Sequence, residues 1–190
     1  MILIDIFKYE VTKYDDWAYN VFVLDLRNDN LTIIMKIITS LASVLVLGSI
    51  ILLVFLLSKN KKNSFYMLIN LFIVFILNNI LKVSVERPRP SGYNIIEENF
   101  YSFPSGHSMV SVAFYGFLIY LVYNNINNKI LKYLLIFILF MTIILICISR
   151  IYLGVHYLSD VVAGFAFSIA YLMIFITIIE KYNLLEVKNV

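Results

Sequence analysis

Long apolar stretches separated by short polar segments dominate the chain. Five stretches contain no Asp, Glu, Lys or Arg, at residues 37–58, 63–81, 99–128, 133–149 and 161–179. A helix needs about 20 mostly apolar residues to cross a bilayer. The pattern therefore predicts five membrane-spanning helices, at about 33–57, 64–82, 105–123, 131–149 and 159–179. The expected fold class is an all-α, polytopic transmembrane helix bundle.

The composition agrees with this pattern and removes several other classes of protein. Of the 190 residues, 62% are apolar and 14% are charged, and the net charge is +3. Soluble domains contain about 45–50% apolar residues, so an ordinary soluble domain, a disordered chain and a basic nucleic-acid-binding protein are excluded. The single cysteine, Cys147, lies in an apolar stretch. We expect it to be a core residue, and it can form neither an intrachain disulfide nor a cysteine metal cluster.

The N-terminal segment is too polar for a span and lacks the basic start and unbroken apolar run of a signal peptide. Residues 1–30 contain six acidic and three basic side chains. We expect an amphipathic helix at the membrane interface, anchored by Phe7, Trp17, Tyr19, Phe22 and Leu26. A six-span alternative, with residues 1–25 as an additional span, is disfavoured by these charges. The predicted division is an interfacial segment at 1–31, a transmembrane domain at 32–182 and a cytoplasmic tail at 183–190.

Charges in the loops predict the orientation of the bundle. Five spans place the loops 58–63 and 124–132 on one face together with the C-terminus, and these loops carry Lys59, Lys61, Lys62, Lys129 and Lys132. The N-terminal segment, the loop 83–104 and the turn 150–158 fall on the other face. Because positively charged loops stay in the cytoplasm, we expect a multi-pass protein of the cell membrane whose second face is extracytoplasmic.

The polar residues at the span ends gather on that second face. They are Lys82, Arg87, Arg89, Ser105, Gly106, His107, Arg150, His156 and Asp160, and they include both histidines of the chain. Ionisable groups at membrane depth are costly and usually functional, and a cluster of lysine and arginine suits a phosphate anion. Any one of these cations alone can equally be a residue that reaches for the lipid headgroups, as we expect of Lys36 and Lys132.

Two of these segments predict specific local structures. Residues 104–107, Pro-Ser-Gly-His, are typical of a helix start, with Ser105 as N-cap and free backbone N–H groups that can bind an anion beside His107. His156 and Asp160 are four residues apart, so on a helix they share a face, and the carboxylate orients the imidazole as a nucleophile or base. The plainer alternatives are a capped helix start with a surface histidine, and an exposed His–Asp pair. A metal site is a weaker interpretation, because the nearby cations repel a metal ion.

Together these segments resemble the type 2 phosphatidic acid phosphatase (PAP2) superfamily over about residues 32–179. Its motifs are Lys-x6-Arg-Pro, Pro-Ser-Gly-His and Ser-Arg-x5-His-x3-Asp. Here they correspond to Lys82 with Arg89-Pro90, to Pro104-Ser105-Gly106-His107, and to Ser149-Arg150 with His156 and Asp160. Every motif position matches, in order. Arg87 stands only four residues after Lys82, so we assign the motif to Arg89 and keep Arg87 as a supporting residue.

The resemblance implies a role for each matched position. His156 is the expected nucleophile that becomes phosphohistidine, Asp160 is its orienting partner, and His107 is the general acid that afterwards activates water. The expected phosphate-binding residues are Lys82, Arg89, Ser105, Gly106 and Arg150. The family needs no metal and no other cofactor, so none is expected here.

The resemblance also implies that the substrate is a lipid phosphate. Among the lipids of bacterial members, the small chain and the external face favour undecaprenyl diphosphate over phosphatidylglycerophosphate and phosphatidic acid, by analogy only. The stretch 91–103, with Tyr93, Phe100, Tyr101 and Phe103, is expected either to form part of the lipid entrance or to be a plain interfacial loop. The alternatives are a lipid phosphotransferase and, in a different class, an anion transporter. No nucleic acid and no obligate protein partner is indicated.

Overall fold

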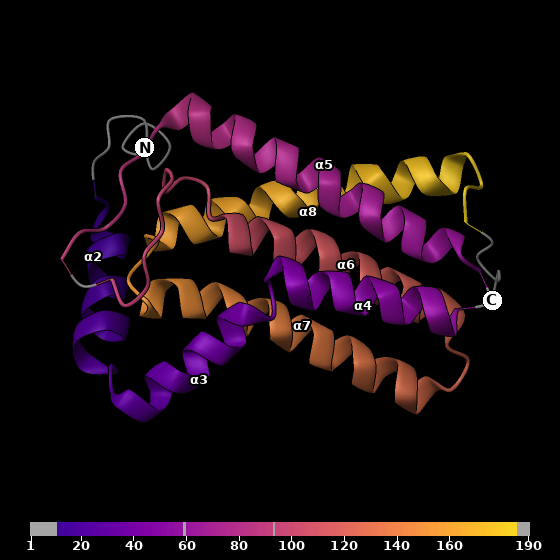
Figure 1. Ribbon diagram of the computed structural model, residues 1–190, viewed down its shortest axis with the longest axis horizontal. Helices are drawn as coiled ribbons and strands as arrows, with labels where there is room; N and C mark the ends of the chain where they lie inside the picture. Colours follow the sequence, from indigo (N-terminus) through magenta and orange to yellow (C-terminus); the bar gives the residue numbers. More distant parts are fainter. Residues whose placement is uncertain (1–10, 59, 93, 186–190) are drawn as a thin grey trace.

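The chain folds into a bundle of helices in a computed structural model that describes residues 11–58, 60–92 and 94–185. These residues form helices, turns and loops, and no β-strand occurs among them. The helices are α2 (Lys13–Tyr19), the π-helical η1 (Asn20–Asp25), α3 (Asp29–Ser40), α4 (Val44–Leu57), α5 (Lys62–Val85), α6 (Gly106–Asn125), α7 (Lys129–Tyr152) and α8 (Leu158–Lys181). Figure 1 shows α4 to α8 running along the long axis of the molecule, with α2 at one end.

The membrane-spanning helices agree with the sequence prediction. Within the described residues, four helices, α5 to α8, are long and apolar enough to cross a membrane, and α3 with α4 makes a fifth candidate span that is bent by 51°. The predicted spans at 64–82, 105–123, 131–149 and 159–179 match α5 to α8 to within three residues at each end. The protein is therefore a polytopic, all-helical membrane protein, as predicted.

The first predicted span, at 33–57, is not one straight helix. α3 ends at Ser40 and α4 begins at Val44. The backbone N–H of Leu41 donates to the carbonyl three residues back at 3.1 Å, and the Ser43 side chain caps α4 by accepting the Val46 N–H at 3.4 Å. Serine side chains compete for nearby backbone groups, which explains how this segment breaks without proline or glycine.

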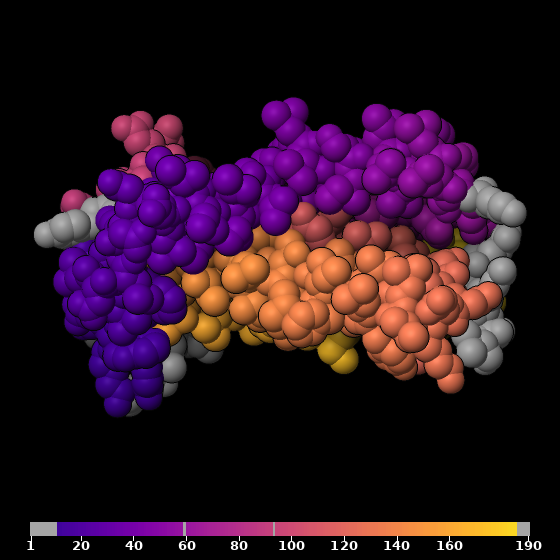
Figure 2. All heavy atoms as spheres, turned by 90° about the horizontal axis from the view of Figure 1, so that it is seen from below, coloured from indigo at the N-terminus to yellow at the C-terminus, as the bar shows by residue number. Residues whose placement is uncertain are grey.

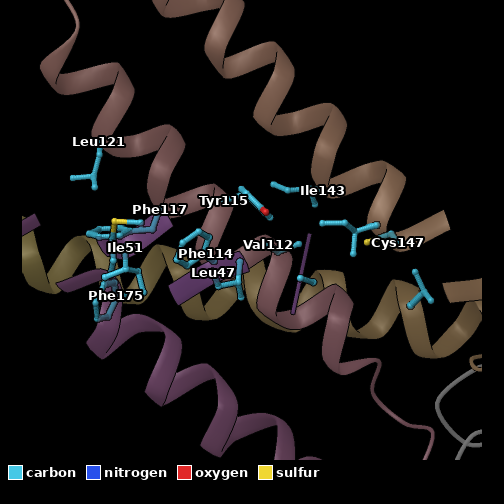
Figure 3. Close-up of a cluster of buried hydrophobic side chains, with 14 of the residues drawn as sticks. Leu47, Ile51, Val112, Phe114, Tyr115, Phe117, Leu121, Ile143, Cys147 and Phe175 are labelled. Carbon is cyan, nitrogen blue, oxygen red and sulfur yellow. The ribbon is translucent and has the colours of Figure 1, made fainter. Parts of the chain in front are cut away.

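α6 is the central helix of the bundle. It packs against α5, α7 and α8. Of the residues in its most apolar stretch, 50% are buried inside the bundle, against 22–33% for the corresponding stretches of α5, α7 and α8. Figure 3 shows the largest cluster of buried side chains, in which Phe114 and Phe117 of α6 lie beside Ile51 of α4 and Phe175 of α8. Cys147 of α7 is buried in the same cluster, as predicted for a core residue. The outward faces keep large apolar side chains exposed, which suits contact with lipid.

The N-terminal elements are tied to the end of α7. Arg27 donates from Nη2 to the Tyr152 carbonyl at 2.7 Å. The Tyr152 hydroxyl in turn accepts the Asn28 backbone N–H at 3.1 Å and lies 3.0 Å from the Thr32 hydroxyl. In Figure 2 the indigo N-terminal residues accordingly cover one end of the bundle. These contacts fix α2 and η1 beside the span ends.

The predicted membrane anchors of this segment differ in exposure. Trp17 and Leu26 are exposed, Tyr19 and Phe22 are half-buried, and Phe7 lies outside the described residues. Asp15 lies on the inner face of α2 and is buried, which the amphipathic pattern did not predict. This carboxylate sits against the span ends that carry the candidate site.

Candidate active site

The eight predicted site residues lie at one end of the bundle, the end that α2 covers. Figure 1 shows this end on the left, where the loop between α5 and α6 and the turn between α7 and α8 come together. Lys82, Arg89, Gly106, His107 and His156 line one cavity of about 610 Å³. The remaining three, Ser105, Arg150 and Asp160, are buried.

His156 lies in the turn just before α8 and not on the helix, so the expected helical spacing of the His–Asp pair is wrong. α8 begins at Leu158, and Tyr157 is its N-cap. Asp160 meets His156 for another reason. Its Oδ2 accepts the Tyr157 backbone N–H at 2.9 Å and lies 3.5 Å from His156 Nδ1. The carboxylate that caps the helix start therefore also faces the histidine.

The contacts of His156 indicate which ring nitrogen carries the hydrogen. Arg89 Nη1 lies 3.1 Å from His156 Nε2, and a guanidinium can only donate. Nε2 is therefore the acceptor, and Nδ1 carries the hydrogen toward Asp160. Burial lowers the pKa of His156 to about 4, with Asp160 opposing the shift and Arg150 and Arg89 adding to it. At neutral pH the ring is uncharged and keeps a lone pair on Nε2.

Asp160 has two further side-chain partners. Ser102 Oγ donates to Asp160 Oδ2 at 2.5 Å, and Arg87 Nη1 donates to Oδ1 at 2.6 Å. Ser102 is brought there by its backbone N–H, which donates to the Arg87 carbonyl at 2.8 Å. Arg87 thus contacts the proposed orienting carboxylate, which agrees with its expected role as a supporting residue beside the motif. Ser102 could not be predicted from the sequence, because nothing in its spacing relates it to Asp160.

Glu98 is a second site residue that the sequence did not single out. Its carboxylate accepts from Arg150 Nη2 and lies 3.7 Å from Arg89 Nη2. Burial acts to raise the pKa of Glu98, but Arg150 and Arg89 outweigh it, so this pKa lies below its usual value. For Arg89 burial has the opposite sign: it lowers the pKa of the guanidinium, and the nearby Glu98 carboxylate only partly offsets this. Arg89 and Arg150 therefore already hold one carboxylate between them.

Backbone carbonyls fix the cations that line the cavity. Lys82 Nζ donates to the Tyr101 carbonyl. Arg89 donates from Nε to the Phe100 carbonyl at 2.5 Å and from Nη1 to the Val155 carbonyl at 2.8 Å. Lysine and arginine each carry further donors, so these anchored side chains can still bind an anion.

The start of α6 is locked to the start of α8. Ser105 caps α6 as predicted, since its Oγ accepts the Ser108 N–H at 3.4 Å, and its own backbone N–H donates to the Asp160 carbonyl at 3.1 Å. A Cβ at Gly164 would lie 2.8 Å from the Ser105 carbonyl oxygen, so the close approach of α8 requires glycine. His107 lines the cavity, and its ring makes no hydrogen bond to any residue in the described part of the chain.

The cavity joins this polar end to an apolar wall. The apolar lining comes from Val44 and Leu47 of α4, Leu68, Leu71, Phe72 and Phe75 of α5, and Val110 of α6. Phe72 and Phe75 are 66% and 60% exposed on the outer surface. The cavity is therefore bordered by lipid-facing side chains, and it fits a ligand with an anionic head and a hydrocarbon tail.

The loop 91–103 contributes to this cavity only in part. Phe100 lines the cavity and is exposed, whereas Phe103 is buried against Val85 and does not belong to an entrance. Tyr101 contributes its backbone carbonyl to Lys82. Tyr93 lies outside the described residues.

The donor set around His156 suits an anion better than a metal ion. Among the described residues, no group of three or more His, Cys, Asp or Glu side chains is arranged to hold a metal. The charged groups that act on the His156 ring are instead Arg89, Arg150 and the paired Asp160. Guanidinium groups match the oxygens of a phosphate.

Comparison with known proteins places these residues in a family. The sequence profile of the PAP2 superfamily matches residues 63–184, a segment that contains all the predicted site residues. The chain is 36% identical over 95 residues to phosphatidylglycerophosphatase B of Bacillus subtilis, a match that covers 48% of this chain and 45% of that protein. It is 31% identical over 119 residues to sphingosine-1-phosphate phosphatase 1 of Rattus norvegicus, covering 58% and 27% respectively. The matches thus span less than half the length of these relatives.

Solved structures show the same architecture. The crystal structure of a transmembrane PAP2-type phosphatidylglycerolphosphate phosphatase from Bacillus subtilis superposes with a TM-score of 0.83 at 28% identity, covering 95% of this chain and 92% of that one. The crystal structure of Aquifex aeolicus LpxE gives a TM-score of 0.69 at 23% identity, covering 84% and 92%, which is a likeness of fold alone. Motifs, site geometry and similarity agree that the chain belongs to the PAP2 superfamily.

Proposed function

We propose that this protein is a membrane phosphatase that removes phosphate from lipids through a phosphohistidine intermediate on His156. One observation carries the proposal. A single cavity is lined by His156, by the cations Lys82 and Arg89, and by an apolar wall that faces the bilayer. The relatives support it, because they are phosphatases by name.

In the first step the cations bind the phosphate and His156 attacks it. Arg89 turns from His156 Nε2 to the phosphate oxygens, which Lys82 and Arg150 also contact. Nε2 forms a bond to phosphorus while the bond from phosphorus to the lipid oxygen breaks, and His107 gives that oxygen its proton. Asp160 stabilises the positive charge that develops on the attacking ring. The cations stabilise the charge on the phosphoryl oxygens, which is most of what this kind of transfer requires.

In the second step water releases the phosphate. His107, now without its proton, takes one from a water molecule, and the water oxygen attacks phosphorus. The bond between phosphorus and Nε2 breaks, inorganic phosphate leaves, and both histidines return to their starting states. The free ring of His107 at the cavity wall is suited to both roles.

Phosphatidylglycerophosphate is the substrate that we place first. Phosphatidylglycerophosphatase B and the PAP2-type enzyme of known structure from Bacillus subtilis act on it by name. Undecaprenyl diphosphate, which the family resemblance favoured by analogy, and phosphatidic acid are further candidates. All three combine a phosphate head with a hydrocarbon tail, which is the chemistry of the cavity.

The two alternative functions use the same residues differently. A lipid phosphotransferase shares the first step but passes the phosphoryl group to an acceptor other than water. An anion transporter uses the cations and leaves the pairing of His156 with Asp160 and Ser102 without a purpose. That pairing favours a covalent step on His156.

We further propose that the site faces the outside of the cell membrane. The site lies at the end of the bundle opposite the α4–α5 loop, which carries Lys61, and the start of α7, which carries Lys129 and Lys132. Positively charged loops remain cytoplasmic. A lipid phosphate would then enter from the outer leaflet.

The proposal is tested by phosphate release from detergent-purified protein in excess EDTA. The substrates are phosphatidylglycerophosphate, phosphatidic acid and undecaprenyl diphosphate. We expect release from phosphatidylglycerophosphate, none from the His156→Ala variant, and wild-type release from Lys132→Met, which changes a cation at the opposite end of the bundle. EDTA should have no effect, because Lys82, Arg89 and Arg150 supply the positive charge.

Each arm of the assay can contradict part of the proposal. Wild-type turnover in His156→Ala would exclude the phosphohistidine route. Activity lost in EDTA and restored by magnesium would exclude a metal-free reaction. Phosphate transfer to another lipid with little free phosphate would identify a phosphotransferase, and release from undecaprenyl diphosphate alone would reassign the substrate.

A further inference from the structure

Asp15 of α2 is a buried carboxylate that the proposed reaction does not use. Its side chain is 0% exposed, although α2 lies at the end of the bundle and the neighbouring Asp16 is exposed. A buried carboxylate is costly unless it is paired. We propose that Asp15 and Arg87 form a positioning pair that fixes the Asp160 carboxylate, and through it His156. This inference rests on the proposed function and extends the active site to the N-terminal helix.

The pair forms a continuous series of contacts that ends at the histidine. Arg87 Nη2 lies 3.3 Å from Asp15 Oδ2, and Arg87 Nη1 lies 2.6 Å from Asp160 Oδ1. The other oxygen of Asp160, Oδ2, lies 3.5 Å from His156 Nδ1. The Asp160 carboxylate is thus held on one oxygen by Arg87 while the other faces the ring. The Tyr157 ring, 4.2 Å from the guanidinium carbon, supports Arg87 further.

Ser159 connects Asp15 to the first turn of α8. Asp15 Oδ1 accepts the Ser159 backbone N–H at 2.8 Å, and Oδ2 accepts the Ser159 hydroxyl at 2.9 Å. Arg87 Nη1 donates to the same hydroxyl oxygen at 2.7 Å. A carboxylate at the free N–H groups of a helix start is stabilising. α2 therefore holds the turn that carries Asp160.

The charges of the pair affect the reaction as well as the fold. When His156 Nε2 bonds to phosphorus, positive charge develops on the ring and the negative charge of Asp160 stabilises it. Arg87 alone would weaken this effect, because it lies against the same carboxylate. Asp15 neutralises Arg87 and so preserves the charge of Asp160. Stability alone does not require such a network, since apolar residues of similar volume often replace a buried ion pair without loss.

The Asp15→Asn substitution replaces none of the other titratable and charged residues around His156. They are Asp160 on α8, Arg150 on α7, His107 on α6, Lys82 on α5, and Arg89 and Glu98 on the loop before α6. A change in the protonation of His156 in an Asp15 variant therefore reports on the contacts through Arg87.

The kinetic test compares Asp15→Asn with Asp16→Asn, a matched change of an exposed carboxylate on the same helix. For phosphatidylglycerophosphate hydrolysis we expect Asp15→Asn to lower kcat about 10–100-fold, as for the loss of a group that orients a reacting residue, with KM within about threefold. The acid limb of kcat/KM should move to lower pH, because an Arg87 charge that is no longer neutralised disfavours the protonated ring. Asp16→Asn should keep the wild-type values. Ser159→Ala should show a smaller loss of kcat in the same direction.

A second measurement does not depend on activity. The chain has two histidines, so His156 is the only one left in a His107→Ala background, and its ring nitrogens can be followed by ¹⁵N NMR. We expect Asp15→Asn to increase the fraction of rings with the hydrogen on Nε2 and to lower the pKa of His156. Asp16→Asn in the same background should change neither. Arg87→Lys, which keeps the charge but loses the fork, should alter the tautomer fraction more than the pKa.

The possible outcomes separate this inference from the proposed function. If Asp15→Asn lowers only the melting temperature, while kcat, the pH profile and the NMR signals match Asp16→Asn, the pair is structural and the inference is wrong. If the wild-type protein releases no phosphate from any lipid but Asp15→Asn still shifts the His156 tautomer, the positioning pair stands and the proposed phosphatase function fails.

Discussion

His156 and His107 differ most in how their rings are held. The His156 ring is buried and contacts Asp160 on Nδ1 and Arg89 on Nε2, so its orientation is fixed before any substrate binds. The His107 ring lines the same cavity and has no hydrogen-bond partner among the described residues. A fixed, uncharged ring suits an attacking atom, whereas a free ring can give its proton to the leaving group and later take one from water.

This difference predicts that the loss of each histidine affects a different step when the leaving group needs no proton: without His156 the phosphoenzyme cannot form, and without His107 it is hydrolysed slowly. With p-nitrophenyl [³²P]phosphate, whose leaving group departs without needing a proton, His107→Ala should still form the phosphoenzyme but hydrolyse it slowly. We expect ³²P to accumulate on His107→Ala protein in an acid-labile, alkali-stable form, and His156→Ala to carry no label. Lys132→Met should behave like the wild-type protein and controls for the effect of a substitution as such. Labelled His156→Ala protein would assign the nucleophile to another residue.

At the scale of elements, the site depends on how closely α6 and α8 approach each other. Gly164 lies where a Cβ would come within 2.8 Å of the Ser105 carbonyl oxygen, which is backbone and cannot move aside. Gly116 lies on α6, where a Cβ would meet the tip of the Leu172 side chain of α8, which can rotate. Gly164 is therefore required for the contact between the two helix starts at the site, whereas Gly116 is involved only in ordinary helix packing.

Gly164→Ala should therefore reduce catalysis far more than Gly116→Ala. The added methyl group pushes the start of α6, with Gly106 and His107, away from His156, and misplacement by about 1 Å can lower a rate about 100-fold. We expect Gly164→Ala to lose kcat by that order and Gly116→Ala to keep most of it. Phosphate release and the melting temperature of both proteins check this. Equal kcat losses in the two variants would show that helix packing in general, and not the motif contact, limits activity.

At the scale of the whole molecule, the two ends of the bundle are chemically distinct. One end holds the candidate site under α2 and η1, and the other holds the α4–α5 loop with Lys61 and the start of α7 with Lys129 and Lys132 (Figures 1 and 2). The apolar flanks between them match the lipid core of a membrane. This polarity leads to an expectation about orientation in the cell.

The expected orientation can be measured with single cysteines. Asn94 and Asn127 are exposed residues at opposite ends of the bundle, and the native Cys147 is buried. A membrane-impermeant maleimide should label Asn94→Cys in intact cells, and should label Asn127→Cys only after the membrane is opened. The unmodified protein controls for reaction at Cys147. The reverse pattern would place the site on the cytoplasmic side.

The hydrophobic pattern predicted the helices well, because each span must be continuous, apolar and long enough for the bilayer. The predicted ends of α5 to α8 lie within three residues of the observed ends. Ser105 caps α6, as its position before Gly106 indicated. The bend between α3 and α4 was not predicted, since it depends on weak local bonds of Ser40 and Ser43 and not on proline or glycine. The His–Asp contact was expected on a helix, but it forms through a capping carboxylate at the start of α8.

The sequence by itself determined the membrane-spanning helices, the family and the set of residues that meet in the site, because spacing within short motifs and hydrophobic length are local properties. Only the tertiary structure decided which groups surround that set. Glu98 between the arginines, Ser102 on Asp160, and Asp15 behind Arg87 are contacts between segments far apart in the chain. No periodicity or motif encodes such contacts. They arise when packing of the helices closes the loops and α2 over one end of the bundle.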